Sequence, residues 1–200
     1  IGAITAAAVA VTRANRSPGS VSLVLESPAF LTKPSPKAKL PQIGMVKTLA
    51  LRLNRVIVRF VLLLPGFTYS RAFWRGGLRA AYANMDEGRF EKQVLLYRWP
   101  SLCKGWALGL ANFVSARLLS ISEDSMVLQE LIDATDANKL RVAIITGDQD
   151  RVVPVRNSQR LRDLLGCQFM TLEGCGHVAH EEDPERFARA VADFTSDSAS

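Results

Sequence analysis

The chain has 200 residues, of which 48% are hydrophobic and 22% charged, and its formal net charge is +6. This length and composition predict one globular domain with an insertion, or a large piece of one. The basic residues are scattered, and their densest group, Arg71, Arg75 and Arg79, has the spacing of a solvated helix face, so we expect no nucleic-acid partner. Three widely spaced cysteines argue against a disulfide framework and favour an intracellular compartment. Organellar targeting stays open because the sequence starts without a methionine.

The first part of the chain predicts a helix and a strand. Residues 1–14 are rich in alanine, the best helix former, and predict a helix entered at its first turn. A nearly continuous apolar run at 21–25 predicts a strand covered on both faces. Ser27 and Pro28 end this strand, and the proline-rich residues 33–41 predict an exposed connector.

Residues 45–64 are strongly apolar, but four basic side chains interrupt them. A membrane-spanning helix needs about 20 largely uncharged residues, so this segment does not predict a span. Its basic and apolar side chains fall on opposite sides of a helix, which Pro65 and Gly66 end. We expect this helix to cover a pocket, with peripheral contact to a membrane surface as the alternative.

The remaining elements predict a parallel sheet with a helical insertion. Between residues 42 and 134 the pattern favours helices only, at 73–83, 87–97, 101–119 and 123–134. Strands at 140–146 and 168–172 then alternate with helices at 157–165 and 184–194, which is typical of parallel strands with crossover helices. The predicted organisation is core at 1–32, a helical cap insertion at 33–134, core at 135–195 and a tail at 196–200.

Two polar side chains follow the last two predicted strands. Asp150 lies on a turn after the strand at 140–146, and His177 follows Gly174 and Gly176 after the strand at 168–172. An imidazole titrates near neutral pH, so it can accept a proton and return it, and a carboxylate can orient it. We therefore predict that His177 is a general base and Asp150 its orienting acid. We also expect both glycines to adopt a positive-φ backbone.

Several nearby residues leave alternatives open. Asp148, two residues before Asp150, could be the acid instead. We expect His180 to support the site or to face solvent, and Cys175 to be a small buried residue rather than a nucleophile. With two histidines and no paired-cysteine motif, the sequence predicts no metal site and no cofactor.

The residues from 141 to 194 resemble the cap-bearing branch of the α/β-hydrolase superfamily. The segment ITGDQDRVVPV resembles the turn after its seventh strand, and LEGCGHVAHEEDPERFARAVADF resembles the turn after its eighth strand with the last helix. Residues 1–30 resemble the helix after the nucleophile and the sixth strand. The resemblance implies an α/β fold class, the C-terminal part of a parallel sheet with an inserted helical cap. It also implies that Asp150 and His177 are the last two members of a Ser…Asp…His triad. Glu26, at the end of the first strand, occupies the place where some members of the family carry their acid, and is the alternative to Asp150.

The nucleophile implied by this resemblance is not among the 200 residues, which contain no Gly-x-Ser-x-Gly. The family pattern would put a serine directly before Ile1 and would make the Ile1 N–H a donor to the oxyanion. It implies a serine hydrolase acting, without a cofactor, on an ester or related acyl substrate with an apolar part. Cap aromatics would line the acyl pocket: Phe60, Phe67, Phe73, Trp74, Trp99 and Trp106.

Other readings of the family resemblance stay open. An aspartate in the nucleophile position would imply an epoxide hydrolase or dehalogenase. A non-catalytic receptor or interaction module, or an inactive fragment, is the remaining alternative. We expect the 200 residues alone to be inactive and prone to aggregation, because the strand at 21–25 would lack a neighbour.

Overall fold

The computed structural model describes residues 2–19, 21–30, 69–117 and 121–196. Its contacts divide the chain into two compact units. The first combines Ile1–Thr32, Arg79–Met85 and Glu123–Ser200, and the second combines Lys33–Leu78 and Asp86–Ser122. Residues 79–85 and the whole of the last predicted helix of the insertion, 123–134, therefore belong to the first unit, although the sequence analysis placed them within the insertion. That the insertion acts as a cap stays a prediction.

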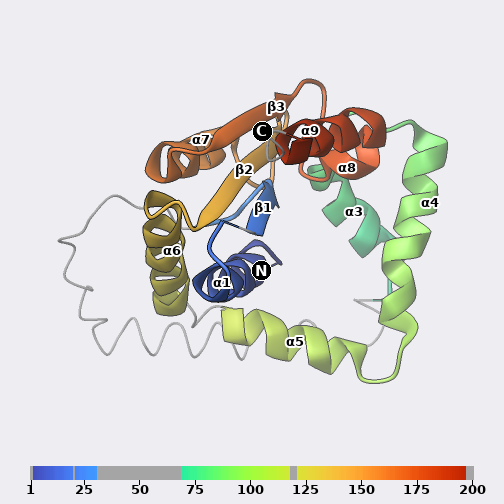
Figure 1. Ribbon diagram of the computed structural model, residues 1–200. Helices are drawn as coiled ribbons and strands as arrows, with labels where there is room; N and C mark the ends of the chain where they lie inside the picture. The colour runs from blue at the N-terminus through green and yellow to red at the C-terminus, as the bar shows by residue number, and fades with distance from the viewer. Residues whose placement is uncertain (1, 20, 31–68, 118–120, 197–200) are drawn as a thin grey trace. The chain divides into compact units, whose positions relative to one another are not determined.

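A parallel three-stranded sheet forms the centre of the first unit (Figure 1). The strands are β1 (Val21–Glu26), β2 (Leu140–Gly147) and β3 (Gln168–Leu172), in the order β1-β2-β3. β2 is almost wholly buried, as its run of apolar residues predicts for a central strand. Within the described residues, β1 pairs with β2 alone, so its other edge carries no strand.

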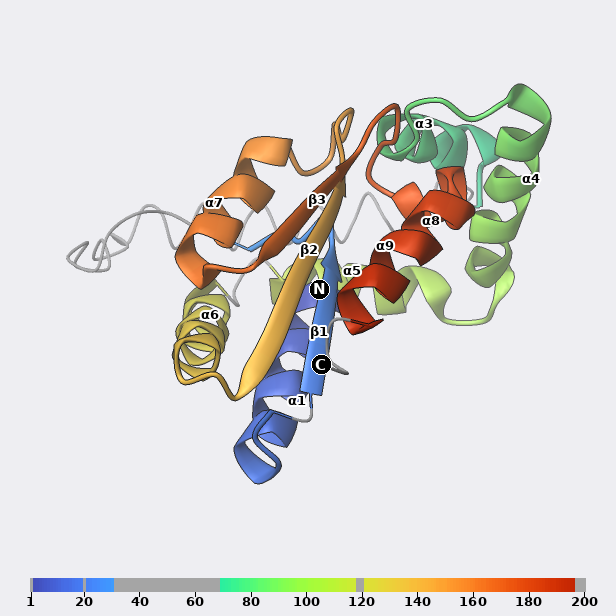
Figure 2. The same ribbon diagram turned by 45° about the horizontal axis from the view of Figure 1, so that its top comes forward.

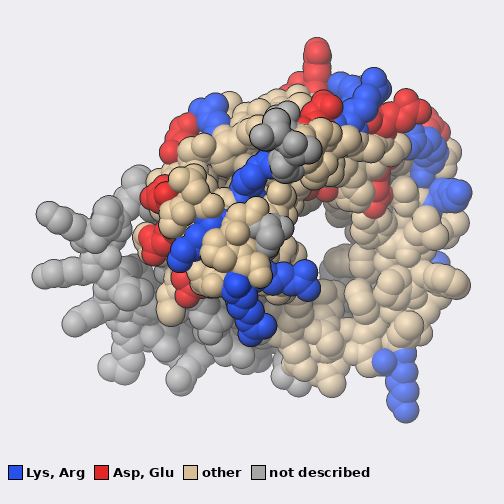
Figure 3. Space-filling view, in the orientation of Figure 1, with Lys and Arg blue, Asp and Glu red and all other residues tan. Residues whose placement is uncertain are grey.

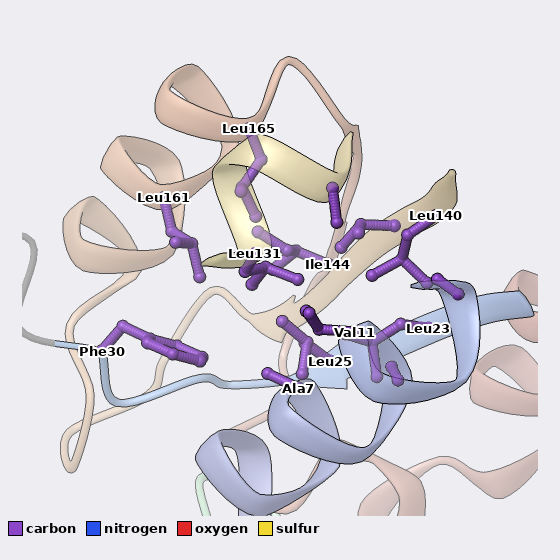
Figure 4. Close-up of a cluster of buried hydrophobic side chains, with 14 residues drawn as sticks. Ala7, Val11, Leu23, Leu25, Phe30, Leu131, Leu140, Ile144, Leu161 and Leu165 are labelled. Carbon is purple, nitrogen blue, oxygen red and sulfur yellow. The ribbon is translucent and has the colours of Figure 1, made fainter. Parts of the chain in front are cut away.

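Three helices cover one face of this sheet: α1 (Gly2–Arg16), α6 (Ile121–Asp136) and α7 (Val155–Leu165) (Figure 2). In α1 the buried residues Ala7, Ala10, Val11 and Ala14 follow helical spacing, so a stripe of small side chains faces the strands. These side chains pack with leucines and isoleucines of the sheet and of the other two helices (Figure 4). The larger of the two hydrophobic cores therefore lies on this face.

The opposite face is covered by the short helix α8 (Ala179–Glu182) and by α9 (Pro184–Ser196). Ile145 and Leu172 from the strands pack there with Cys175, Ala179 and Ala190, which are all buried. α9 begins with Pro184, a residue favoured at the first helical position. The carboxylate of the preceding residue, Asp183, accepts the N–H of Arg186 at 2.9 Å and caps the helix.

The described part of the second unit is helical. It contains most of α3 (Arg71–Ala81), α4 (Glu87–Arg98), the 3₁₀ turn η1 (Trp99–Leu102) and α5 (Trp106–Arg117). Phe90 and Val94 of α4 are fully buried. Glu87 and Glu91 form ion pairs with arginines of α3, so Arg71 and Arg75 do not form the purely solvated face that their spacing predicts.

The helix predicted at 101–119 is interrupted. Pro100, which has no N–H, lies in η1, and Gly105 adopts a φ of 83°, so α5 begins only at Trp106. The sequence analysis did not predict α8, which is only one turn long. The helix predicted at 45–64, together with Phe60 and Phe67, lies outside the described residues. Of the helices that the structure describes, none is long and apolar enough to cross a membrane.

Candidate active site

The site residues lie just beyond the carboxyl ends of the strands. Ser27 follows β1, the turn with Asp150 follows β2, and the turn with His177 follows β3. Because the strands are parallel and adjacent, these turns meet at one edge of the sheet. That edge is where open α/β sheets bind their ligands.

The acid and the base predicted from the sequence are in contact. The His177 Nδ1 lies 2.9 Å from the Asp150 Oδ2. The Asp150 side chain is fully buried, whereas 29% of the His177 side chain is exposed. The contact through Nδ1 leaves the other ring nitrogen of His177 for a proton exchanged with a reacting group.

Hydrogen bonds hold Asp150 as a carboxylate. Burial acts to raise its pKa, but hydrogen bonds from His177, the Val153 N–H and Ser27 outweigh this effect and lower the pKa below its usual value. The other oxygen, Oδ1, accepts the N–H groups of Val152 and Val153, each at 2.8 Å. The acid is therefore charged and oriented, as an acid that stabilises an imidazolium must be.

Ser27 is a contributor that the sequence analysis did not identify as a site residue. It is buried, and its φ of 41° is in the left-handed region that residues other than glycine rarely adopt. Its hydroxyl lies 3.4 Å from that of Thr146, and its N–H donates to Ile145. The only sequence signal was its place at a strand end before a proline.

The turns that carry Asp150 and His177 are joined to each other. Asp148 Oδ1 accepts the Gly174 N–H at 2.7 Å, and the Gln149 N–H donates to the Cys175 carbonyl at 2.9 Å. A Cβ on Gly147 would lie 2.2 Å from that same carbonyl oxygen, so only glycine allows this approach. Asp148, the alternative acid, thus binds the neighbouring turn, and Asp150 contacts the histidine.

The backbone of His177 is held by a segment that is distant in sequence. Its N–H donates to the Ala81 carbonyl at 2.7 Å. The Glu182 carboxylate accepts the Gly176 N–H at 2.6 Å with one oxygen, and the N–H groups of Ala83 and Asn84 at 2.9 and 2.8 Å with the other. Glu182 stood out in the sequence only as part of the entry to the last helix, and backbone acceptors such as Ala81 carry no sequence signal.

The expectation for the glycines before His177 is half right. Gly174 has a φ of 75°, as predicted. Gly176 is not among the positive-φ residues, so the prediction is wrong for it. It is needed for space instead, because a Cβ there would lie 2.4 Å from the Ala81 oxygen and 2.9 Å from the Ala83 nitrogen.

The other alternative acid, Glu26, contacts a different histidine. Its Oε1 accepts the His180 N–H at 3.0 Å, and its Oε2 lies 2.7 Å from the His180 Nδ1. The structure thus brings together two separate carboxylate–histidine pairs, Asp150 with His177 and Glu26 with His180. The exposure of the two rings also differs, because 45% of the His180 side chain is exposed.

The remaining residues considered in the sequence analysis lie outside the Asp150–His177 contact. Cys175 is buried, and burial raises the pKa of its thiol. Ile1, the predicted oxyanion donor, lies outside the described residues. In the second unit, the Trp74 ring contacts those of Phe73 and Trp106, whereas 72% of Trp99 is exposed. No cluster of three or more His, Cys, Asp or Glu that could bind a metal occurs in the described ranges.

The Asp…His order on neighbouring turns after parallel strands agrees with a family match that spans residues 2–190, to the alpha/beta hydrolase family. The chain belongs to the alpha/beta hydrolase family. Among curated proteins, the monoacylglycerol lipase abhd6-B of Xenopus laevis is 43% identical to this chain over 54 residues. The match covers 26% of this chain and 16% of that protein.

Solved structures show the same alpha/beta hydrolase fold. An esterase from Thermogutta terrifontis matches with a TM-score of 0.59 and 18% identity, over 100% of this chain and 63% of that one. A hydrolase-fold protein from Burkholderia ambifaria matches with 0.57 and 21%, over 94% and 62%. A serine hydrolase involved in carbazole degradation matches with 0.57 and 17%, over 98% and 60%. The chain therefore spans less than two thirds of the length of these structures, and the likeness to them shows the fold.

Proposed function

We propose that this chain is part of a serine hydrolase that cleaves an ester or a related acyl substrate with an apolar part. The observation that carries the proposal is the Asp150–His177 contact at 2.9 Å, with a buried acid and a partly exposed base. The names of the related proteins agree with it, since they include a monoacylglycerol lipase, an esterase and a serine hydrolase. The nucleophilic serine would come from residues outside the 200.

In this mechanism the pair acts on the proton of the serine. His177, with its Nδ1–H donated to Asp150, accepts the serine proton at Nε2 as the oxygen attacks the acyl carbon. The Asp150 carboxylate stabilises the imidazolium that forms. His177 then gives the proton to the leaving alcohol, which leaves the acyl group on the serine. A water molecule that loses a proton to His177 attacks this ester, and the serine takes the proton back as the carboxylic acid is released. We assign substrate selection to the helical insertion between β1 and β2.

A fluorophosphonate probe, which modifies activated serines, tests the proposal on a form of the protein that includes the residues upstream. We expect labelling of the parent protein and its loss in His177→Ala. The matched control is His180→Ala, which removes the histidine that contacts Glu26 and should leave labelling intact.

Other outcomes would contradict the proposal and indicate a different function. Labelling that persists in His177→Ala would show that this residue is not the base. Absence of labelling together with turnover of epoxides or haloalkanes would indicate an aspartate nucleophile. Absence of both labelling and turnover would indicate a non-catalytic member of the family.

A further inference from the structure

The helix α4 has two apolar faces, and among the described residues only one of them is covered. Phe90 and Val94, which are fully buried, form the inner face. Lys92, Leu95, Leu96 and Trp99 follow the spacing i, i+3, i+4, i+7 and lie on the opposite side. A surface helix normally has a single apolar stripe, so a second one indicates a contact outside the unit.

The second stripe consists largely of bulky apolar side chains that are exposed to solvent. The exposed fractions are 51% for Leu95, 50% for Leu96 and 72% for Trp99. The surface continues into the following turn, where Leu102 is 56% exposed and Lys104 is also exposed. We call these six residues the outer face of α4: Lys92, Leu95, Leu96, Trp99, Leu102 and Lys104.

The charge around the outer face has one sign. The sequence from residue 92 to 122 contains Lys92, Arg98, Lys104 and Arg117 but no Asp or Glu. The acidic residues of this region, Asp86, Glu87 and Glu91, precede that stretch and form ion pairs with arginines. In Figure 3 the end of α4 and the turn that follows are mostly tan, with a basic side chain projecting from the turn and red atoms near the start of the helix.

We propose that the outer face of α4 binds the surface of a membrane that carries anionic lipid. Leucines and an exposed tryptophan are suited to the boundary between acyl chains and headgroups, where tryptophan is enriched. Lysines at both ends of the face would lie against anionic headgroups, which attract basic residues near a membrane surface. The inference rests on the second unit and does not depend on the proposed reaction.

A second copy of the chain is a poorer partner for this surface. A two-fold contact would bring the same face of both copies together. It would place Lys92 and Lys104 of one copy near those of the other, with no acidic side chain in the face to compensate. The charge therefore favours an anionic lipid surface.

Co-sedimentation with vesicles tests the proposal. The chain is mixed with vesicles of phosphatidylcholine alone or with about 30% phosphatidylserine, which supplies the anionic surface. We expect stronger binding to the anionic vesicles, and weaker binding as salt is raised. The double variant Leu95→Gln with Leu96→Gln should bind anionic vesicles about tenfold more weakly, because it removes apolar contact without adding charge.

Two further variants complete the design. Lys92→Gln with Lys104→Gln should lower binding to anionic vesicles but leave binding to neutral ones unchanged. The matched control is Leu164→Gln on α7, which changes a leucine of similar exposure, 47%, and should bind like the parent. Circular dichroism checks that all variants keep the parent fold, as expected for exposed positions. Brominated lipid should quench tryptophan fluorescence in the parent but much less in Trp99→Phe.

Three results would overturn the proposal. The parent chain could stay in solution with both kinds of vesicle. Binding could survive in the leucine and the lysine variants, which would assign lipid contact to another segment, such as the helix predicted at 45–64. Light scattering could show a dimer that Leu95→Gln with Leu96→Gln dissociates, which would make a second copy the partner.

Discussion

The Glu182 carboxylate accepts the backbone N–H of Gly176 at 2.6 Å, directly before the histidine of the candidate site. Its other oxygen binds the N–H groups of Ala83 and Asn84. One side chain thus joins the loop that presents His177 to a segment almost a hundred residues away. A charged acceptor shared by three backbone donors is a strong and directional tie.

Replacing Glu182 should loosen this tie. Glu182→Gln removes the charge and one acceptor, and turns an N–H₂ group toward backbone donors. We expect the free energy of unfolding to fall by about 1–3 kcal/mol, and hydrogen exchange at Ala83 and Asn84 to accelerate. Urea unfolding and exchange measured by NMR would show this. The control, Glu173→Gln at an exposed position, should change neither quantity; equal effects of both variants would refute the assignment.

Asp150→Asn should lower turnover far more than Glu26→Gln in an active form of the protein. An asparagine at 150 cannot hold the required tautomer of His177, and such changes lower kcat by about 10⁴-fold. Glu26 contacts His180 instead, so its amide should leave kcat within a few-fold. Steady-state kinetics with a p-nitrophenyl ester measure both. A large loss of kcat in Glu26→Gln with a small loss in Asp150→Asn would show that the acid is Glu26, at the end of β1.

The stability of the protein should depend on Asp150 at acidic pH. Its pKa is lower in the folded protein than the usual value of 3.8, so the unfolded chain binds its proton more readily. The contribution of the carboxylate is therefore complete above that value and is lost as the pH falls through the folded pKa. The melting temperature, measured from pH 7 down to acidic pH, should depend less on pH in Asp150→Asn than in the parent. Parallel curves for parent and variant would contradict this and would leave Asp183, a half-buried acid whose pKa its hydrogen bonds with Arg186 also lower, as the source of the pH dependence.

Gly176→Ala should disturb the histidine loop, because its Cβ would lie 2.4 Å from the backbone oxygen of Ala81. The matched control is Gly76→Ala in α3, where a Cβ meets no atom within 4 Å. We expect the first change to lower the melting temperature, and the second to keep or raise it, since alanine is favoured over glycine in a helix by up to about 1 kcal/mol. Differential scanning calorimetry would compare them, and a stable Gly176→Ala would show that residues 81–83 do not lie against the loop.

The three cysteines should react with thiol reagents at two rates. Cys103 is exposed, whereas burial raises the pKa of Cys167 to about 11 and also raises that of Cys175. Because the thiolate is the reactive form, at about pH 8 one thiol should react rapidly and two slowly. Following the reaction with a disulfide reagent, and repeating it with Cys103→Ser, checks this. Fast reaction of Cys175 would contradict the expectation that this residue is not a nucleophile.

The strands and the pairing of Asp150 with His177 could be predicted from the sequence, because both have local signals. An apolar run marks β2, and glycines mark the turn before His177. The contacts that hold these two residues in place could not be predicted, because backbone atoms make most of them. Nothing in the residue types of Ala81 or Ala83 indicates that they meet the histidine loop. The role of Gly176 was misjudged for the same reason, since its glycine is required by a neighbour that is distant in the chain.

The contacts of the Ala81–Asn84 segment have a consequence for folding kinetics. The site joins groups near residues 27, 82, 150 and 177, and the contacts of Ser27 with Thr146 and of Ala81 with His177 close long loops of chain. Closing such loops costs entropy before the contacts can compensate for it, which slows their formation. The sheet can pair β2 with β3 over a short connection, but the histidine loop reaches its final geometry only when the segment after α3 has docked. The site should therefore be among the last parts of the molecule to become ordered.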